Sequence, residues 1–390
     1  MQYDALIIGA GFAGAVAARQ LAEGGLHVLL LERRSHIGGN AYDYLDDTGV
    51  LIHQYGPHIF HTNNRQVYEY LSRFTEWHSY SHRVITSIPS ADGGRMKYPV
   101  PFNLTSLETA FGHDAGKRLE DKLIAAYGAE QKVTILDLRQ NSDSEISSLA
   151  DYIYDHVFVF YTMKQWGQTP EEIDPNTTGR VPIFLSRDDR YFQDVYQGIP
   201  RNGYTALFLH LLNHPNIEIR LNTDALDHLA FSGDSVRFDG NPFNGPIIYT
   251  GAPDELFGSA YGHLPYRTLD FLFESHPVDF FQSHGTVNYT VDQDFTRITE
   301  FKHLTGQTLS STTTIVKEFS RTYTGKKGEV PYYAIINETN NALHSKYAAL
   351  AAHYKNLYLL GRLAEYKYYN MDAIVARALE LSEQIMRNLK

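Results

Sequence analysis

The chain has 390 residues, more than one ordinary core holds, so two or three domains are expected. Its net charge is −11 and no Lys/Arg run exceeds two residues, which argues against a nucleic-acid partner. The absence of Cys excludes disulfides, thiolate zinc sites and a Cys-linked flavin. No bilayer-length apolar run or signal-peptide pattern is present, so we expect a cytoplasmic protein with no membrane partner.

The first elements predict a nucleotide-binding unit. Residues 5–8 are a short apolar run typical of a buried parallel strand, 12–23 fit a packed helix, and 28–31 form a second strand. A further helix is expected at 65–76, and a strand, turn and strand at 83–100.

The middle of the chain changes character. Residues 104–172 are mostly helical in pattern, and 173–204 are rich in Pro, Gly and Asp, which indicates an irregular loop region. After a helix near 204–213, short strand-like pieces run through 217–330, for example 285–291 and 312–318.

The last segments return to the character of the first, with a buried strand at 357–360 and an amphipathic helix at 372–389. We therefore predict an α/β fold with a discontinuous Rossmann-like FAD-binding domain (1–80, 201–240 and 331–390). A mainly helical domain (101–200), with a mobile substrate lid near 173–187, and an antiparallel β-sheet domain (81–100 and 241–330) are inserted in it.

The glycine-rich turn after the first strand predicts a dinucleotide site. Gly9 permits the tight turn, Gly11 lets the backbone approach a pyrophosphate, and Gly14 lets helix and strand pack closely. The helix that begins at Phe12 and Ala13 presents free N–H groups to the phosphates. Glu32 ends the second strand, where a carboxylate accepts both ribose hydroxyls.

A second glycine pair indicates which dinucleotide is bound. Gly38 and Gly39 follow Glu32 after five residues, and the combined pattern resembles the FAD-binding motif of the amine-oxidase-like flavoproteins. The segment ending at Gly361 and Arg362 resembles the second flavin segment of that superfamily, in which Asp is the most frequent residue after the glycine. The helix that starts near Asp372 can point its N-terminus at the flavin.

Several longer blocks resemble the bacterial UDP-galactopyranose mutase family in order along nearly the whole chain. They are Tyr-Gly-Pro-His-Ile-Phe-His-Thr at 55–62, Tyr-Thr-Met-Lys-Gln-Trp-Gly at 161–167, Asp-Asp-Arg-Tyr-Phe at 188–192, Tyr-Gln-Gly-Ile-Pro at 196–200, Tyr-Arg-Thr-Leu-Asp-Phe at 266–271, Thr-Arg-Ile-Thr-Glu at 296–300, Pro-Tyr-Tyr at 331–333 and Gly-Arg-Leu at 361–363.

The resemblance implies an isomerase that interconverts UDP-galactopyranose and UDP-galactofuranose. Reduced FAD attacks the anomeric carbon through N5 and displaces UDP, and the sugar ring then opens as an iminium and recloses. It also implies a reductant such as NAD(P)H, a homodimer, and a role in supplying galactofuranose for cell-surface polysaccharide.

The resemblance assigns roles residue by residue. Arg180 and Arg297 match two arginines that stabilise charge on the departing pyrophosphate, and His61 lies near the flavin N5. Residues expected to bind substrate are Phe158, Tyr161, Trp166, Tyr191, Phe192, Asn288, Tyr333, Tyr368, His82 and Asn370. Residues expected to bind the cofactor, besides those of the glycine motifs and Glu32, are Arg33, Asn40, His58, Ile59, His61, Arg267, Arg362 and Asp372.

Two features qualify these roles. The pair His58 and His61 has no third ligand at a matching spacing, so we expect both to shape the flavin site and predict no metal. His82 and Asn370 depart from the residues common in the family, Asn and Asp respectively, which changes the expected contacts with the sugar.

Two other function classes remain open. An FAD-dependent oxidoreductase of the amine-oxidase type would share the fold and motif but would turn over an oxidant stoichiometrically. A non-enzymatic binder on the same fold, like the Rab GDP-dissociation inhibitors, would hold no tightly bound flavin.

Overall fold

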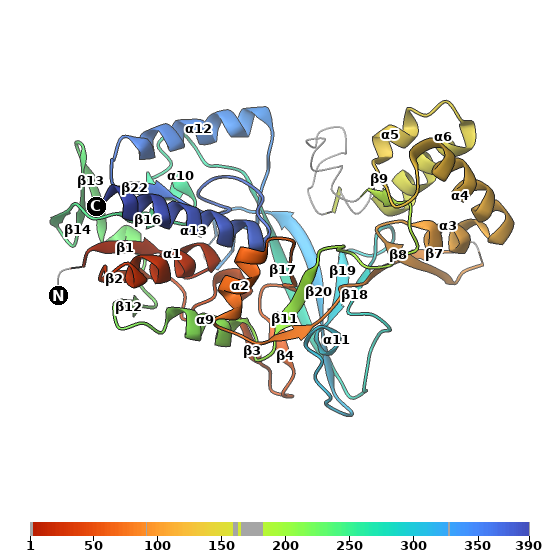
Figure 1. The fold of residues 1–390 in the computed structure, drawn as a ribbon, viewed down its shortest axis with the longest axis horizontal. Helices are drawn as coiled ribbons and strands as arrows, with labels where there is room; N and C mark the ends of the chain where they lie inside the picture. Colours follow the sequence, from red (N-terminus) through yellow and green to blue (C-terminus); the bar gives the residue numbers. More distant parts are fainter. Residues whose placement is uncertain (1–2, 91, 159–162, 165–181, 327, 390) are drawn as a thin grey trace.

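The computed structural model describes residues 3–90, 92–158, 163–164, 182–326 and 328–389. The molecule is elongated, with a parallel-sheet lobe at one end, a helical lobe at the other and a large sheet between them (Figure 1). Among the described residues, no helix combines the length and apolarity needed to cross a bilayer.

The first lobe is built on a five-stranded parallel sheet, which confirms the Rossmann-like expectation. Its strands, in spatial order, are β12 (Ile217–Arg220), β2 (Val28–Leu31), β1 (Ala5–Ile8), β16 (Ile247–Tyr249) and β22 (Leu357–Leu359). β1 and β2 are buried along their whole length, because both faces of the sheet are covered.

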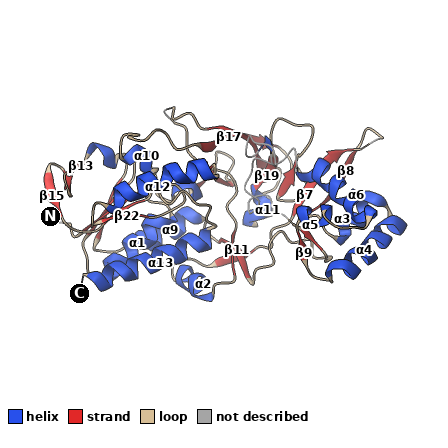
Figure 2. Ribbon diagram, turned by 90° about the horizontal axis from the view of Figure 1, so that it is seen from above, coloured by secondary structure: helices blue, strands red, loops and turns tan. Residues whose placement is uncertain are grey.

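Different elements cover the two faces of this sheet (Figure 2). One face packs against four helices: α1 (Phe12–Glu23), α2 (Arg65–Ser72), α9 (Tyr204–Leu212) and α13 (Met371–Asn388). The other packs against α10 (Pro253–Leu256), the 3-10 turn η3 (Ala225–Asp227), α12 (Glu338–Ala352) and a small antiparallel sheet of β13 (Leu229–Ser232), β14 (Ser235–Phe238) and β15 (Asn241–Phe243).

The central sheet has seven strands. In order they are β21 (Tyr333–Ala334), β17 (Tyr266–His276), β20 (Thr313–Thr322), β19 (Arg297–Glu300), β18 (Thr286–Asn288), β7 (Val84–Pro89) and β8 (Arg95–Val100). All neighbours are antiparallel except β18 and β7, which run parallel. The short helix α11 (Phe301–Thr305) follows β19.

The helical lobe has a separate apolar core. Its elements are α3 (Leu104–Phe111), α4 (His113–Tyr127), α5 (Ile135–Arg139), α6 (Ser144–Ile153), the π-helical turn η2 (Tyr154–Phe158), and the paired strands β9 (Lys132–Val133) and β10 (Ile183–Phe184). Polar side chains cap these helices: Asn103 begins α3 with a capping box, and Asp143 accepts from the first turn of α6.

Two smaller sheets join the lobes. One contains β5 (Phe60–Thr62), β11 (Tyr196–Pro200) and β6 (Trp77–Ser79), and the other is the hairpin of β3 (Asp43–Leu45) and β4 (Leu51–His53). The short turn η1 (Gly39–Ala41) precedes this hairpin. β11 pairs with β5 on one side and β6 on the other, so residues near 60 and near 197 lie side by side.

The structure differs from the predicted organisation in three details. β16 lies in the parallel sheet, although we placed all of 241–330 in the antiparallel domain. Its three residues are all apolar and all buried, the pattern of a strand covered on both faces. The predicted helix at 65–76 ends at Ser72, and α12 occupies a region for which we predicted no element.

Candidate active site

The glycine-rich turn after β1 brings the backbone of two loops close together. Gly9 has φ of +101°, a conformation that favours glycine. A Cβ on Gly14 would lie 1.9 Å from the Gly9 carbonyl oxygen, and a Cβ on Gly39 would lie 2.8 Å from Gly11 Cα. Side chains would therefore fill the space at the N-terminus of α1, where free N–H groups attract a phosphate.

Glu32 stands beside this turn at the end of β2. Its carboxylate is buried and accepts the backbone N–H of Ala10 at 2.8 Å and of Arg34 at 2.9 Å. It also lines a pocket of about 230 Å³, which lies along the carboxyl ends of β1, β2 and β16. This is the position where open α/β sheets bind nucleotides, so the glycine cradle and the carboxylate together fit the adenosine diphosphate half of a dinucleotide.

A larger pocket of about 460 Å³ continues from the first toward the central sheet. The residues that line both pockets are Asn40, His58, Tyr332, Arg362, Tyr369 and Met371. The far part of the larger pocket is lined by the central sheet and the helical lobe, at Thr286, Asn288, Thr290, Ile153 and Val157. A ligand held in the smaller pocket can therefore extend into the larger one.

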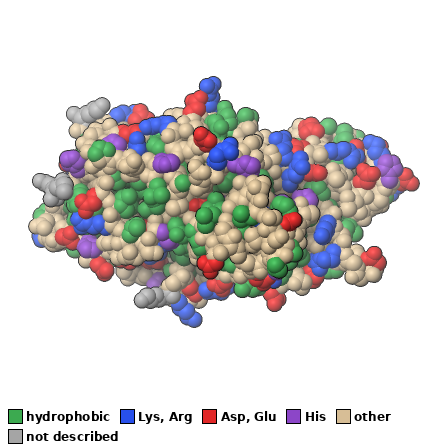
Figure 3. All heavy atoms as spheres, turned by 90° about the horizontal axis from the view of Figure 1, so that it is seen from below, with side chains coloured by type: hydrophobic (Ala, Val, Ile, Leu, Met, Phe, Trp, Pro, Cys, Tyr) green, Lys and Arg blue, Asp and Glu red, His purple; other side chains and the backbone are tan. Residues whose placement is uncertain are grey.

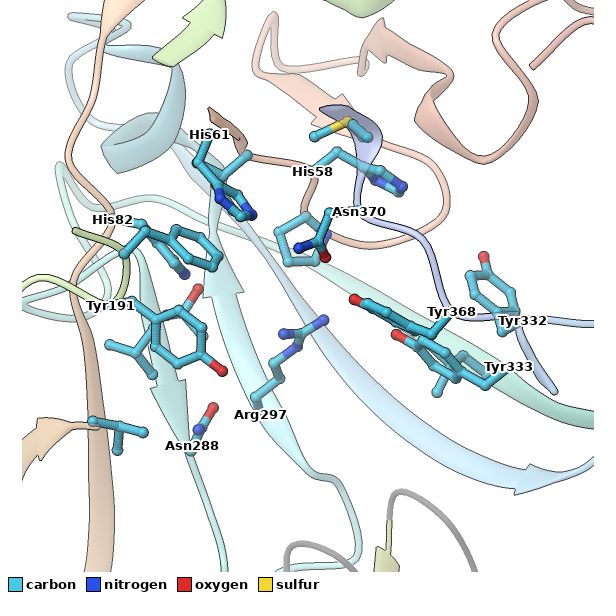
Figure 4. A pocket seen from close by; sticks show the side chains of 18 of the residues that line it. His58, His61, His82, Tyr191, Asn288, Arg297, Tyr332, Tyr333, Tyr368 and Asn370 are labelled. Carbon is cyan, nitrogen blue, oxygen red and sulfur yellow. The ribbon is translucent and has the colours of Figure 1, made fainter. Parts of the chain in front are cut away.

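Arg297 points into the larger pocket from β19 (Figure 4). Its Nε donates to Glu318 Oε1 at 2.7 Å, and Glu318 is only 1% exposed. Burial, reinforced by the nearby charge of Arg297, lowers the pKa of His82 to about 3. Burial likewise lowers the pKa of His58 to about 3. Both imidazoles are therefore neutral at pH 7, so they leave the positive charge of this region to the arginines.

Arg362 stacks with two tyrosines at the junction of the pockets. Its guanidinium carbon lies 5.0 Å from the Tyr333 ring centre and 4.9 Å from that of Tyr368. The two rings are nearly parallel, with centroids 6.3 Å apart. Burial raises the pKa of the Tyr333 hydroxyl, which keeps it protonated and able to donate a hydrogen bond to an anionic ligand.

Comparisons with known proteins give the family. The family model described as UDP-galactopyranose mutase matches residues 156–368, and that of the NAD(P)-binding Rossmann-like domain matches 7–74. UDP-galactopyranose mutase of Mycoplasma pneumoniae is 35% identical over 99% of this chain and 97% of its own. The chain belongs to the UDP-galactopyranose mutase family.

A second sequence relative and a solved structure are also similar to this chain. dTDP-fucopyranose mutase of Escherichia coli is also 35% identical, over 99% of both chains. A crystal structure of reduced UDP-galactopyranose mutase matches with a TM-score of 0.70 at 15% identity, covering 100% of this chain and 94% of that one. This likeness shows the fold, and membership of the mutase family makes FAD the cofactor that the two joined pockets fit.

Most residues that the sequence analysis assigned to the site line these pockets. In the larger pocket they are Asn40, His58, Ile59, His61, His82, Tyr191, Phe192, Asn288, Arg297, Tyr333, Arg362, Tyr368 and Asn370. In the smaller pocket they are Gly9, Gly11, Phe12, Ala13, Glu32, Arg33, Gly39, Asn40, His58, Gly361 and Arg362. In Figure 4, the labelled side chains of Tyr191, Arg297 and Tyr368 lie around one space.

Among the assigned residues that the structure describes, four line neither pocket. Arg267 lies on β17 of the central sheet, where its buried side chain donates to the Lys164 carbonyl and to the hydroxyls of Ser320 and Thr322. Gly14 and Gly38 shape the backbone behind the cleft.

Asp372, the fourth, accepts from Thr62 Oγ1 in the first turn of α13 and so ties that helix to β5. Its neighbours Asn370 and Met371 are the residues that reach the pocket. Tyr161, Trp166 and Arg180 lie outside the described residues, as do the side chain of Phe158 and residues 173–181 of the expected lid.

The structure adds residues that the motifs did not single out. Tyr55, Tyr332 and Tyr369 line the larger pocket. Tyr55 and Tyr332 lie within blocks that carried the family resemblance, and Tyr369 lies between the predicted residues Tyr368 and Asn370. Glu318 and Asp194 form hydrogen bonds with the site residues Arg297 and His61. Only their pairing with Arg297 and His61 reveals them, since an isolated acidic residue gives no sequence signal. Within the described ranges, no group of three His, Asp or Glu side chains could hold a metal ion.

Proposed function

We propose that this chain interconverts UDP-galactopyranose and UDP-galactofuranose with FAD in its active, reduced form. We call the smaller pocket the cofactor cleft and the larger pocket the chamber. The observation that carries the proposal is that, in a chain of the mutase family, the dinucleotide-binding cleft and the chamber that Arg297 lines share lining residues. When bound and reduced, FAD supplies a nucleophilic nitrogen for the anomeric carbon of the sugar.

The protein side chains then have to bind and stabilise a diphosphate. A departing nucleoside diphosphate gains negative charge, and Arg297 is a fixed cation in the chamber, held by Glu318. The protonated hydroxyl of Tyr333 adds a donor, and Arg362 lies between the two tyrosines and the cofactor cleft. Arg180 is proposed as the second diphosphate cation on the family resemblance.

The test is conversion of UDP-galactofuranose by the flavin-loaded chain, with and without dithionite. We expect bound flavin in the absorbance spectrum and pyranose formation only after reduction. Absence of conversion by fully reduced, flavin-loaded protein contradicts the proposal. Stoichiometric consumption of an oxidant would favour an amine-oxidase-type oxidoreductase, and purification without bound flavin would favour a non-enzymatic binder.

A second candidate is a mutase for a dTDP-linked 6-deoxy sugar. It is favoured by the Escherichia coli dTDP-fucopyranose mutase, which is as similar to this chain as the UDP-galactopyranose mutase. His82 and Asn370 both line the chamber and depart from the common family residues, so the sugar contacts differ from the usual ones. The ratio of kcat/KM for UDP-galactofuranose and dTDP-fucofuranose decides between the candidates.

We also propose a cytoplasmic homodimer that uses NAD(P)H as reductant and supplies activated sugar for cell-surface polysaccharide. The family resemblance supports each part.

On the face shown in Figure 3, the described Lys and Arg side chains are interspersed with acidic ones, which does not favour binding to a polyanion. Light scattering of the purified protein tests the dimer, and anaerobic bleaching of the flavin by NADH or NADPH tests the reductant.

A further inference from the structure

A carboxylate stands directly behind one histidine of the chamber. His61 Nδ1 and Asp194 Oδ2 are 2.6 Å apart, and the side chains are 13% and 24% exposed. His61 lies on β5 and Asp194 just before β11, and the register of these strands sets His61 opposite Gln197. Residues far apart in the sequence are thus held together by a strand pair.

Neighbouring groups fix both members of this pair. The His61 ring stacks on Phe192, with centroids 3.6 Å apart and planes 11° from parallel. The side-chain amide of Gln197 donates to the carbonyls of Phe192 and Asp194, which holds the loop between them. Asn63 donates from Nδ2 to the second carboxylate oxygen of Asp194 at 2.6 Å.

The direction of these bonds determines where His61 carries its proton. An ionised carboxylate only accepts, so Nδ1 of His61 must be the donor in this pair. Because Asp194 takes up Nδ1, Nε2 is the ring nitrogen left to bond a ligand in the chamber that His61 lines (Figure 4). We propose that Asp194 is a positioning residue that fixes this tautomer of His61, so that proton exchange with the chamber takes place at Nε2.

The inference rests on the proposed function, because conversion between a pyranose and a furanose needs an atom that can exchange a proton with the sugar oxygens. When the bond from the anomeric carbon to the ring oxygen breaks, that oxygen gains a proton. When the new ring forms, the attacking hydroxyl loses one. As the imidazolium, His61 can give its Nε2 proton to the ring oxygen, which leaves the neutral Nδ1–H tautomer. This tautomer then takes a proton from the attacking hydroxyl at Nε2, so the imidazolium is restored and there is no net change. In both forms of His61 the Asp194 carboxylate accepts from Nδ1–H, so only the Nε2 proton is exchanged.

The surroundings make Asp194→Asn an unusually direct test. Asn63 Oδ1 accepts the backbone N–H of Val195 at 2.9 Å, which orients the Asn63 amide with Nδ2 toward residue 194. In the variant, the new amide must therefore present its oxygen to Asn63 and its N–H group to His61. His61 Nδ1 is then forced to accept, and the proton moves to Nε2.

The first measurement is the tautomer itself, from nitrogen chemical shifts of the flavin-loaded chain with 15N-labelled histidine. The His61 signals are assigned by their loss in His61→Gln. The spectra are recorded at alkaline pH, where the imidazole is neutral. We expect the Nδ1–H tautomer in the unmodified protein and the Nε2–H tautomer in Asp194→Asn. The Nε2–H tautomer in the unmodified protein overturns the proposal without any variant of Asp194, so a poorly folding variant does not prevent the test.

The second measurement is kinetic. We expect Asp194→Asn to lower kcat by roughly 10²-fold or more, the usual range for misplacing a general acid–base, with KM and the flavin spectrum unchanged. In a His61→Gln background, Asp194→Asn should have no further effect, because Asp194 acts through His61. Additive losses, or an unchanged kcat in the single variant, overturn the proposal.

Asp188→Asn is the matched control. Asp188 lies on the same loop but its carboxylate bonds Arg190, so the same change of charge there should leave kcat and the His61 tautomer as in the unmodified protein. If the unmodified protein interconverts neither nucleotide sugar, the proposed function fails. The tautomer measurement still decides whether Asp194 controls His61.

Discussion

Arg297 and Glu318 are direct cross-strand partners on β19 and β20, joined by an Nε–Oε1 hydrogen bond of 2.7 Å. Glu318 is 1% exposed, whereas the guanidinium reaches the chamber. The buried carboxylate thus holds the cation at the position where we propose that a diphosphate binds. Such a pair adds little net stability, but it restricts the directions in which the arginine can point.

Replacing Glu318 by Gln should therefore impair catalysis more than folding. A hydrogen bond to a charged group is worth about 1.5–3 kcal/mol, so we expect kcat/KM to fall about 10- to 100-fold. Steady-state kinetics of the reduced enzyme measures this. Glu274→Gln is the control, since Glu274 pairs with Lys317 on the same sheet away from the chamber. An equal loss in both variants would refute a specific role for Glu318.

Gly39→Ala should weaken flavin binding. Gly39 has φ of +56°, and a Cβ there would lie 2.8 Å from Gly11 Cα. This contact would force the loop at Gly39 or the turn at Gly11 to shift where the phosphates of FAD would bind, so we expect affinity for FAD to fall by roughly tenfold or more, about 1.4 kcal/mol. Flavin absorbance per protein after dialysis measures this. Gly240→Ala is the control, because Gly240 has φ of +76° but open space around it, and it should retain its flavin.

Stability should fall on acidification because of His82. Burial lowers its folded-state pKa to about 3, whereas an unfolded His has a pKa of about 6.5. Between these values the unfolded state binds more protons, so stability is lost as pH falls below about 6.5. From pH 7 to 5, we expect His82 to contribute a loss of about 2 kcal/mol in the free energy of unfolding.

Chemical denaturation at the two pH values measures this loss. His82→Asn should show a correspondingly smaller difference, because the amide does not titrate. Replacement of the exposed His27 by Asn should leave the difference unchanged. An identical pH dependence for His82→Asn and the unmodified protein would count against a neutral, buried His82.

Asp43→Asn should destabilise the fold. The Asp43 carboxylate is 2% exposed and accepts the backbone N–H groups of Tyr204 at 2.5 Å and Thr205 at 2.7 Å, in the first turn of α9. An amide cannot accept from both without turning its own N–H group toward a donor, so we expect a loss of about 2 kcal/mol. Denaturant midpoints measure it, with exposed Asp47→Asn as the neutral control.

The sequence by itself determined the cofactor cleft and much of the chamber. The spacing of Gly9, Gly11, Gly14 and Glu32 required a strand, a turn and a helix in fixed order, because that spacing is local and each residue has one geometric task. The segments that resemble the mutase family likewise indicated His61, Arg297 and Tyr333 as site residues, and all three line one pocket.

Only the tertiary structure decided which residues hold those side chains in place by hydrogen bonds. Glu318 reaches Arg297 across two strands, and Asp194 reaches His61 through a strand pair that spans more than a hundred residues of sequence. It also decided that Arg267 bonds the Lys164 carbonyl and that β16 joins the parallel sheet. Strand register is set by packing of the whole sheet, so a partner across a sheet leaves no local trace in the sequence.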